Sequence, residues 1–215
     1  VSLIVVNGVI SVLLGLDLHR RLLLASVRTV SQLLLVGLVL QWVFSRSSWY
    51  VVLGLMIFMV IVAGLSAVQR TERRFPGMRA DSILSMWVSS WLVAAVALFL
   101  VVDVEPWFTP QYAIPLLGMI LGNTLTGISL GLDRFNNELV DRRNEVEGLL
   151  ALGATRWEAA RGSVGNAVRT GMIPILNSMM VVGIVSLPGM MTGQLLAGVD
   201  PIQAVRYQVV IMFFI

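Results

Sequence analysis

Long apolar runs separated by short polar connections constrain this chain more than any other feature. A helix that crosses a bilayer needs about 20 predominantly apolar residues, each adding about 1.5 Å of rise. Runs at or near this length lie close to residues 1–18, 22–44, 49–68, 82–102, 112–132, 168–187 and 202–215. Only 13% of the residues are charged, against about 25% in an ordinary soluble domain. The sequence therefore predicts an all-α, polytopic membrane helix bundle of about seven spans, forming a single transmembrane domain over residues 1–215.

The distribution of arginine predicts how this bundle is oriented. Most arginines lie in the connections after the first, third and fifth runs, whereas the other connections carry only Arg46. Connections rich in positive charge stay on the cytoplasmic side of a membrane. We therefore predict an N-terminus outside and a cytoplasmic C-terminus. Because the chain begins and ends inside apolar runs, at Val1 and Ile215, we expect the first and last spans to be incomplete.

Missing residue types exclude several classes of protein. The chain has no cysteine and one histidine, His19, so it cannot build a disulfide framework, a thiolate metal site or a histidine cluster. All fifteen basic residues are arginine, and a Walker A loop needs a lysine, so any ATP must be hydrolysed by another chain. No HExxH sequence, nucleophile elbow or pair of carboxylates within the runs indicates an enzyme. The short arginine clusters fit membrane topology better than a nucleic-acid surface. We predict a membrane protein that binds no cofactor itself and no nucleic acid.

The longest polar interruption, residues 133–161, predicts a bent pair of helices. Residues 137–152 have a helical pattern of apolar positions, and Gly153 supplies the left-handed residue that ends a helix. Thr155 and Glu158 have the spacing of a capping box, which starts a second helix. Such a corner can present an amphipathic surface to a soluble partner, or it can simply lie on the lipid headgroups. Both interpretations remain open on the residues alone.

A second segment, at about residues 188–199, predicts a break near the outer face. The pair Pro188 and Gly189 interrupts the sixth run, and Asp200 followed by Pro201 restarts the chain as a helix. The residues between them are too apolar for a solvated loop and too few to cross, so we expect a re-entrant or interfacial segment. The residues that would act as a gate or hinge are Pro188, Gly189, Gly193 and Gly198.

Polar and sulfur-bearing side chains within the runs are candidates for a substrate path. Amides and hydroxyls in hydrocarbon need partners, and methionine sulfur is a soft metal ligand. Interhelical hydrogen bonding and flexible packing explain the same residues as well or better. The candidates are Asn123, Thr126, Asn177, Met190, Met191 and Arg206. The glycines of the fifth run, which we expect to serve helix packing, are Gly118, Gly122, Gly127 and Gly131.

The corner also resembles a known docking element. The run Glu147-Gly-Leu-Leu-Ala-Leu-Gly153-Ala-Thr is similar to the loop by which ABC-transporter permeases dock on their ATPase. Gly148 and Leu149 stand where two alanines are usual, and the Leu-Pro pair expected about a dozen residues after the glycine is missing. These departures point away from an ordinary importer permease and toward a more distant relative. The ATPase-coupling residues that this resemblance implies are Glu147, Leu149, Leu150, Gly153, Ala154, Thr155 and Glu158.

Two further runs narrow the resemblance. Ser186-Leu-Pro-Gly-Met-Met-Thr-Gly and Ile114-Pro-Leu-Leu-Gly-Met-Ile-Leu-Gly-Asn123 resemble segments of the Fet-type iron-export ABC permeases, whose plant relatives act in aluminium tolerance. The resemblance implies a homodimer in the lipid of a bacterial inner (plasma) membrane. It also implies a separate cytoplasmic ATPase, which holds ATP and magnesium, and a metal-ion substrate, iron. The metal-binding residues stay unassigned. The alternatives are an autonomous metal-ion carrier or channel, not powered by ATP, and a membrane scaffold without transport.

Overall fold

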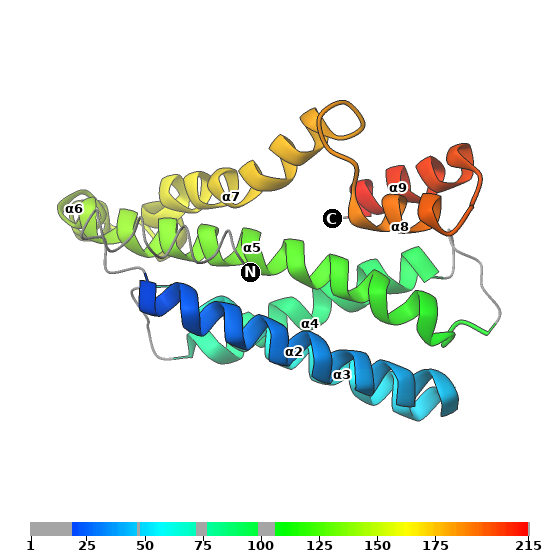
Figure 1. The fold of residues 1–215 in the computed structure, drawn as a ribbon. Coiled ribbons are helices and arrows are strands. Elements are labelled where there is room, and N and C mark those ends of the chain that lie inside the picture. Colours follow the sequence, from blue (N-terminus) through cyan, green and yellow to red (C-terminus); the bar gives the residue numbers. More distant parts are fainter. Residues whose placement is uncertain (1–18, 47, 72–76, 99–105, 215) are drawn as a thin grey trace. The chain divides into compact units, whose positions relative to one another are not determined.

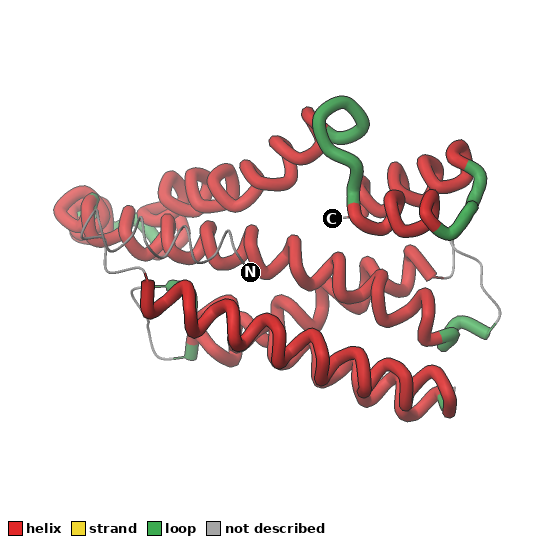
Figure 2. Tube along the Cα trace, viewed as in Figure 1, coloured by secondary structure: helices red, strands yellow, loops and turns green. Residues whose placement is uncertain are grey.

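The computed structural model describes residues 19–46, 48–71, 77–98 and 106–214. Within these ranges the regular elements are eight helices, and the only β pairing is an isolated bridge between Val182 and Ser186 (Figure 2). The predicted all-α class is confirmed. The first predicted span, 1–18, lies outside the described residues, as do Arg73, Arg74 and the end of the fourth predicted span. The chain divides into two compact units, residues 1–48 and 49–215.

The described part of the first unit is one long helix, α2 (His19–Arg46). Its stretch Leu22–Arg46 is long and apolar enough to cross a membrane. The hydroxyls of Ser26 and Thr29 donate to carbonyls four residues earlier, so they need no partner from another helix. At its end the guanidinium of Arg46 lies 5.0 Å from the ring centroid of Trp42, a cation–π contact suited to a membrane interface.

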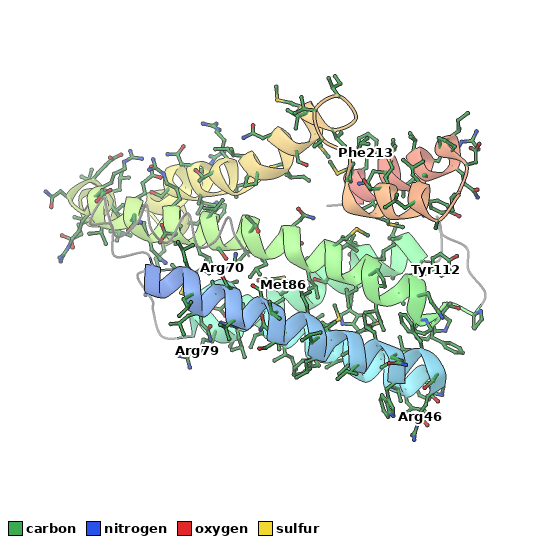
Figure 3. All side chains as sticks on the ribbon, in the orientation of Figure 1. Arg46, Arg70, Arg79, Met86, Tyr112 and Phe213 are labelled. Carbon is green, nitrogen blue, oxygen red and sulfur yellow. The ribbon has the colours of Figure 1, made fainter. Side chains whose placement is uncertain are left out.

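The core of the second unit is formed by α3 (Trp49–Gln69), α4 (Met78–Val96) and the first half of α5 (Pro110–Asp141). The buried positions of α4 recur every four residues, at Met78, Ser82, Met86, Ser90 and Ala94, which places them on one helix face. Met86 is fully buried on this face (Figure 3). The small residues on the stripe allow α4 to approach its neighbours closely.

Three contacts fix the position of α3 along its neighbours α4 and α5. A Cβ on Gly64 would stand 2.9 Å from the Cα of Ile83, so α3 and α4 touch backbone to backbone, and the hydroxyl of Ser82 donates to the Gly64 carbonyl at 3.0 Å. The hydroxyl of Ser129 lies 3.4 Å from the Ala67 carbonyl. Ser129 of α5 thus lies beside Ala67, near the end of α3. From Ser129 the helix α5 continues to Asp141, which is about 18 Å farther along its axis at 1.5 Å per residue.

The polar interruption folds differently from its prediction in one respect. We expected the fifth span to end near 132 and a separate helix over 137–152, but α5 continues to Asp141 and the chain bends at Arg142 into the short α6 (Arg143–Ala151). The long α7 (Arg156–Val181) follows and packs along α5 more extensively than any other pair of helices (Figure 1). Burial of the α5 face against α7 explains why the helix continues through a polar sequence.

The sixth predicted span also ends elsewhere. Pro188 and Gly189 do not break it, because α7 already ends at Val181, where the chain turns through Gly183 at a φ of +82°. Pro188 instead precedes α8 (Gly189–Leu196), so Gly189 and Gly193 lie within a helix. The predicted restart is confirmed: the Asp200 carboxylate accepts from the backbone N–H groups of residues 202 and 203 at the start of α9 (Pro201–Phe214). The segment that we expected to be re-entrant or interfacial is thus the helix α8, paired with α9 (Figure 1).

Three helices among the described residues are long and apolar enough to span a membrane: α2 over Leu22–Arg46, α3 and α5. The seven-span count and the orientation remain predictions. Within the second unit, Arg70 and Arg79 lie toward the end of the molecule that carries α6, and Tyr112 lies at the opposite end (Figure 3). This separation of arginine from an interfacial aromatic is the arrangement that the predicted orientation requires.

Candidate functional site

The corner between α6 and α7 is a fully satisfied helix end. Gly153 has a φ of +91°, a conformation that glycine adopts without strain. Its N–H donates to the Leu150 carbonyl, and the N–H of Ala154 donates to the Leu149 carbonyl, both at 3.0 Å. This pair of bonds is a Schellman motif, which closes a helix with a left-handed residue. The predicted helix end at Gly153 is confirmed.

The start of α7 confirms the predicted capping box. The backbone N–H of Glu158 donates to the Thr155 hydroxyl oxygen at 3.3 Å, while the Glu158 carboxylate accepts from the backbone N–H and the hydroxyl of Thr155, each at 2.8 Å. Two hydrogen bonds hold the pKa of Glu158 below its ordinary value of 4.5. The larger effect comes from the backbone N–H of Thr155, and the smaller one from the Thr155 hydroxyl. These bonds stabilise the ionised carboxyl.

This depressed pKa predicts an acid-sensitive corner. A carboxyl whose pKa is lower in the folded state stabilises the fold above its unfolded pKa, and the contribution disappears as the pH falls through the folded pKa. We expect a carbon-13 NMR titration of the Glu158 carboxyl, in detergent micelles, to show a midpoint below 4.5. Thr155→Ala removes the hydroxyl donor and leaves the backbone donor, so it should move the midpoint only part of the way back. An unshifted midpoint in the unsubstituted protein would contradict the capping box.

The corner exposes a set of apolar side chains. The leucine that precedes Gly153, Leu152, is 87% exposed, and Trp157 in the first turn of α7 is 64% exposed. Leu149 and Leu150 are exposed beside them. We name these four residues the apolar corner. Exposed apolar side chains gathered in one place indicate a surface that another molecule covers.

The charges around the apolar corner cancel. Residues 142–158 contain three arginines and three glutamates. Arg142 makes a bidentate pair with Glu145, and Arg143 donates to Glu147 at 2.7 Å. The hydrogen bond to Glu145 and the charge of Glu145 raise the pKa of Arg142 above its ordinary value, and Glu147 acts in the same way on Arg143. The corner therefore presents apolar surface without a net charge.

A buried carboxylate joins α5 to α7 just behind the corner. Glu138 is 6% exposed, and its Oε1 accepts from the side-chain Nδ2 of Asn166 at 2.6 Å. The guanidinium groups of Arg134 and Arg142 each lie 3.5 Å from this carboxylate, which offsets its charge. We name Glu138, Asn166, Arg134 and Arg142 the clamp. Sequence reasoning missed Glu138 and Asn166, because the contact joins residues 28 positions apart and no local pattern indicates it.

Beyond the clamp, α5 and α7 meet through small residues. A Cβ on Gly171 would stand 2.7 Å from the Gly127 carbonyl oxygen, and a Cβ on Gly131 would stand 3.3 Å from the Ala167 carbonyl oxygen. The predicted packing role is confirmed for Gly127 and Gly131, and these contacts lie within one chain. The other two glycines of the fifth span differ. Gly118 faces Met59 of α3, and Gly122 has no neighbour at its Cβ position among the described residues.

The predicted substrate-path residues do not share one cavity. Asn123 and Thr126 line a pocket of about 580 Å³ between α4, α5 and α7. Met190 lines a pocket of about 390 Å³ between α5, α8 and α9, and Met191 lines one of about 280 Å³ between the end of α7, α8 and α9. Asn177 and Arg206 line none of these three. The pocket of about 580 Å³ contains one acidic side chain that sequence reasoning did not select, Asp81 of α4.

The donors of the 580 Å³ pocket are oxygen and amide groups. Its polar lining comprises Asp81, Ser82, Ser85, Asn123, Thr124 and Thr126. The Asn123 amide donates to the Met119 carbonyl, and the Thr126 hydroxyl donates to the Gly122 carbonyl, so both are satisfied within α5. No group of three or more His, Cys, Asp or Glu side chains with metal-binding geometry lies in the described ranges. The pocket therefore offers oxygen and amide groups, but among the described residues it holds no cluster of acidic or imidazole metal ligands.

Comparisons with known proteins identify the family. The sequence profile of the uncharacterised protein family UPF0014 matches residues 1–215. The UPF0014 membrane protein slr1647 of Synechocystis is 41% identical over 201 residues, covering 94% of this chain and 78% of the relative. The probable iron export permease protein FetB of Escherichia coli is 32% identical over 213 residues, covering 99% of this chain and 81% of the relative. The Protein ALUMINUM SENSITIVE 3 of Arabidopsis thaliana is 34% identical over 200 residues, covering 92% of this chain and 71% of the relative.

No solved structure matches the chain. The resemblance to the Fet-type permeases, drawn from short runs of sequence, is confirmed over nearly the whole chain. The apolar helices agree with relatives that are named as membrane proteins. The chain therefore belongs to the UPF0014 family of membrane proteins, which includes a probable iron export permease.

Proposed function

We propose that this protein is the membrane-spanning permease subunit of an ABC exporter that moves iron out of the cell. A separate cytoplasmic ATPase, carrying ATP and magnesium, docks on the corner at Gly153, and two copies of the chain form the transporter in the bacterial inner membrane. The observation that carries this proposal is the apolar corner, which α5 and α7 hold away from the core of the second unit. The FetB relative, a probable iron export permease protein, supports iron as the substrate.

The charge balance favours a protein partner over the lipid surface. A helix that lies on headgroups is usually rich in basic residues on its polar face, because anionic lipids attract them. At this corner each arginine is matched by a glutamate, so no net attraction to lipid results. Trp157 is also one of the residue types that carry most of the binding energy in protein interfaces, where a few buried residues dominate.

The clamp supports a route for the motion. A push on α6 reaches Arg142 directly. The Arg142 guanidinium contacts the Glu138 carboxylate of α5, and its Nη1 lies 3.4 Å from the place that a Cβ on Gly162 of α7 would take. Helix α7 has 26 residues and is about 39 Å long, so its displacement carries from the corner to the turn at Gly183. The 580 Å³ pocket lies along this helix, and its walls change when α7 moves against α4 and α5.

Transport into inverted vesicles tests the proposal. The chain is reconstituted with its copurifying ATPase on the outer surface, and radioactive iron(II) is added outside. We expect accumulation in the lumen that requires ATP and magnesium and is lost without the ATPase. Iron flux by the permease alone would favour the autonomous carrier or channel. ATP-driven flux of another metal and not iron would reject the substrate and keep the rest of the proposal.

The same vesicles separate docking from coupling. Glu138→Ala leaves Asn166 without its acceptor, so we expect a loss of about 1 to 3 kcal/mol of stability and a fall in iron flux of at least tenfold, with the ATPase still bound. The matched control is Glu145→Ala, which removes an exposed partner of the same Arg142 and should change stability by no more than about 1 kcal/mol. Equal effects of the two substitutions would show that the clamp has no special role.

A further inference from the structure

The cavity between the end of α7, α8 and α9 contains three methionines and one amide. Met179 of α7, Met191 of α8 and Met212 of α9 line this space of about 280 Å³, and Gln208 lines it one turn before Met212. The rest of the lining is apolar or glycine: Val182, Gly183, Val205, Val209 and Phe213. Figure 3 shows Phe213 beside the turn that follows α7. Three helices thus contribute one methionine each to the lining of a single space.

The Gln208 side chain marks this cavity as more than packing. Its residue is 7% exposed, and its Oε1 finds no hydrogen-bond partner among the described residues. A buried amide oxygen without a partner costs about 1 to 3 kcal/mol. Most residues of α9 are apolar, and an apolar side chain in place of Gln208 would avoid this cost. A ligand that accepts electron density from the oxygen accounts for its presence.

We propose that this cavity is a binding site for a soft, monovalent metal ion, held by the sulfur atoms of Met179, Met191 and Met212 and the Oε1 of Gln208. Thioether ligands select soft ions such as copper(I), whereas carboxylate and carbonyl oxygens suit harder ions. All four donors are neutral, and none of the lining residues is acidic. An ion of higher charge would enter these apolar walls with nothing to offset it, and the cost of burying charge rises steeply with its magnitude.

This site is independent of the proposed transport of iron. The oxygen donors suited to a harder cation lie in the 580 Å³ pocket between α4, α5 and α7, which shares no residue with the methionine cavity. An ion bound here joins the end of α7 to the α8–α9 hairpin, because its ligands come from all three helices. It would thereby link the end of α7 to a hairpin that follows it along the chain after the turn at residues 182–188.

Silver(I) is the probe for the test, because it is a soft monovalent ion that does not change oxidation state under ordinary handling. Purified full-length chain in detergent and chloride-free buffer is mixed with silver nitrate, passed through a desalting column and analysed for metal by mass spectrometry. We expect one tightly held silver ion per chain. The combined variant Met179→Leu, Met191→Leu and Met212→Leu should lower the affinity at least tenfold, and Gln208→Leu should lower it by a smaller factor.

Two matched controls make the result specific. Met180 neighbours Met179 but is 78% exposed, and Met190 neighbours Met191 but lines a different pocket, so Met180→Leu and Met190→Leu should leave silver binding unchanged. Leucine and methionine have similar volumes, so the variants should fold, and a thermal unfolding curve for each checks this. Unchanged binding in the triple variant, or displacement of silver by equimolar iron(II), would overturn the proposal. Absence of iron flux in vesicles would leave silver binding unaffected.

Discussion

Gly171→Ala is expected to destabilise the protein by about 1 to 3 kcal/mol, the usual cost of overpacking a tight contact. The added Cβ would stand 2.7 Å from the Gly127 carbonyl oxygen, and both sides of this contact are helix backbone, so neither can move without separating α5 from α7. The free energy of unfolding in mixed micelles, followed by tryptophan fluorescence, measures the change.

Gly165→Ala is the control for this substitution. Gly165 lies in the same helix, but a Cβ there meets nothing within 4 Å among the described residues. Alanine is the better helix former by about 0.5 to 1 kcal/mol, so we expect a small gain in stability. A loss of stability at position 171 and a gain at position 165, from the same glycine-to-alanine change, would locate the contact between α5 and α7. A stabilising effect at position 171 would show that the two helices do not touch there.

Leu152→Asn is expected to weaken binding of the proposed partner ATPase about tenfold or more. Burial of a leucine side chain contributes about 1.5 to 3 kcal/mol, and 1.4 kcal/mol corresponds to a tenfold change in the dissociation constant. The substitution leaves Gly153 and the capping box in place, so the corner should keep its shape. Pull-down of the ATPase at several concentrations, or interferometry with the permease immobilised in nanodiscs, measures the loss.

The matched control is Leu196→Asn. Leu196 lies near the end of α8 and is 85% exposed, almost the same as Leu152 at 87%. It also lies close to a left-handed glycine, Gly198 at a φ of +83°, but far along the chain from the corner. We expect ATPase binding to be unchanged. If both variants lose binding to the same degree, the apolar corner is not the docking surface.

Sequence reasoning succeeded where the structure depends on neighbouring residues. The ends of helices at Gly153, Thr155 and Asp200 were predicted correctly, because a left-handed glycine or an oxygen that accepts from nearby N–H groups acts over three or four residues. The exposure of Leu152 also has a local signal that we did not use. It directly precedes Gly153, the left-handed glycine that closes α6.

The incorrect predictions concern helices that depend on distant partners. Pro188 was expected to end the sixth span, but the turn at Gly183 ends it earlier, and a proline that begins a helix looks the same in sequence as one that breaks a helix. The continuation of α5 to Asp141 depends on Glu138 being buried against Asn166, and its sequence there is polar. The placement of Asn123, Met190 and Met191 at three different cavities follows from packing and not from spacing along the chain, and their role as a substrate path stays a prediction.

The charge balance of the corner has a consequence for how the complex behaves in solution. Association driven by opposite charges slows and weakens as salt is added, because ions screen exposed charges over about 10 Å at 0.1 M. A surface with three arginines, three glutamates and an apolar centre gains little from such attraction and loses little to screening. The proposed complex of the chain with its ATPase should therefore withstand high-salt washes that strip electrostatically bound proteins from membranes.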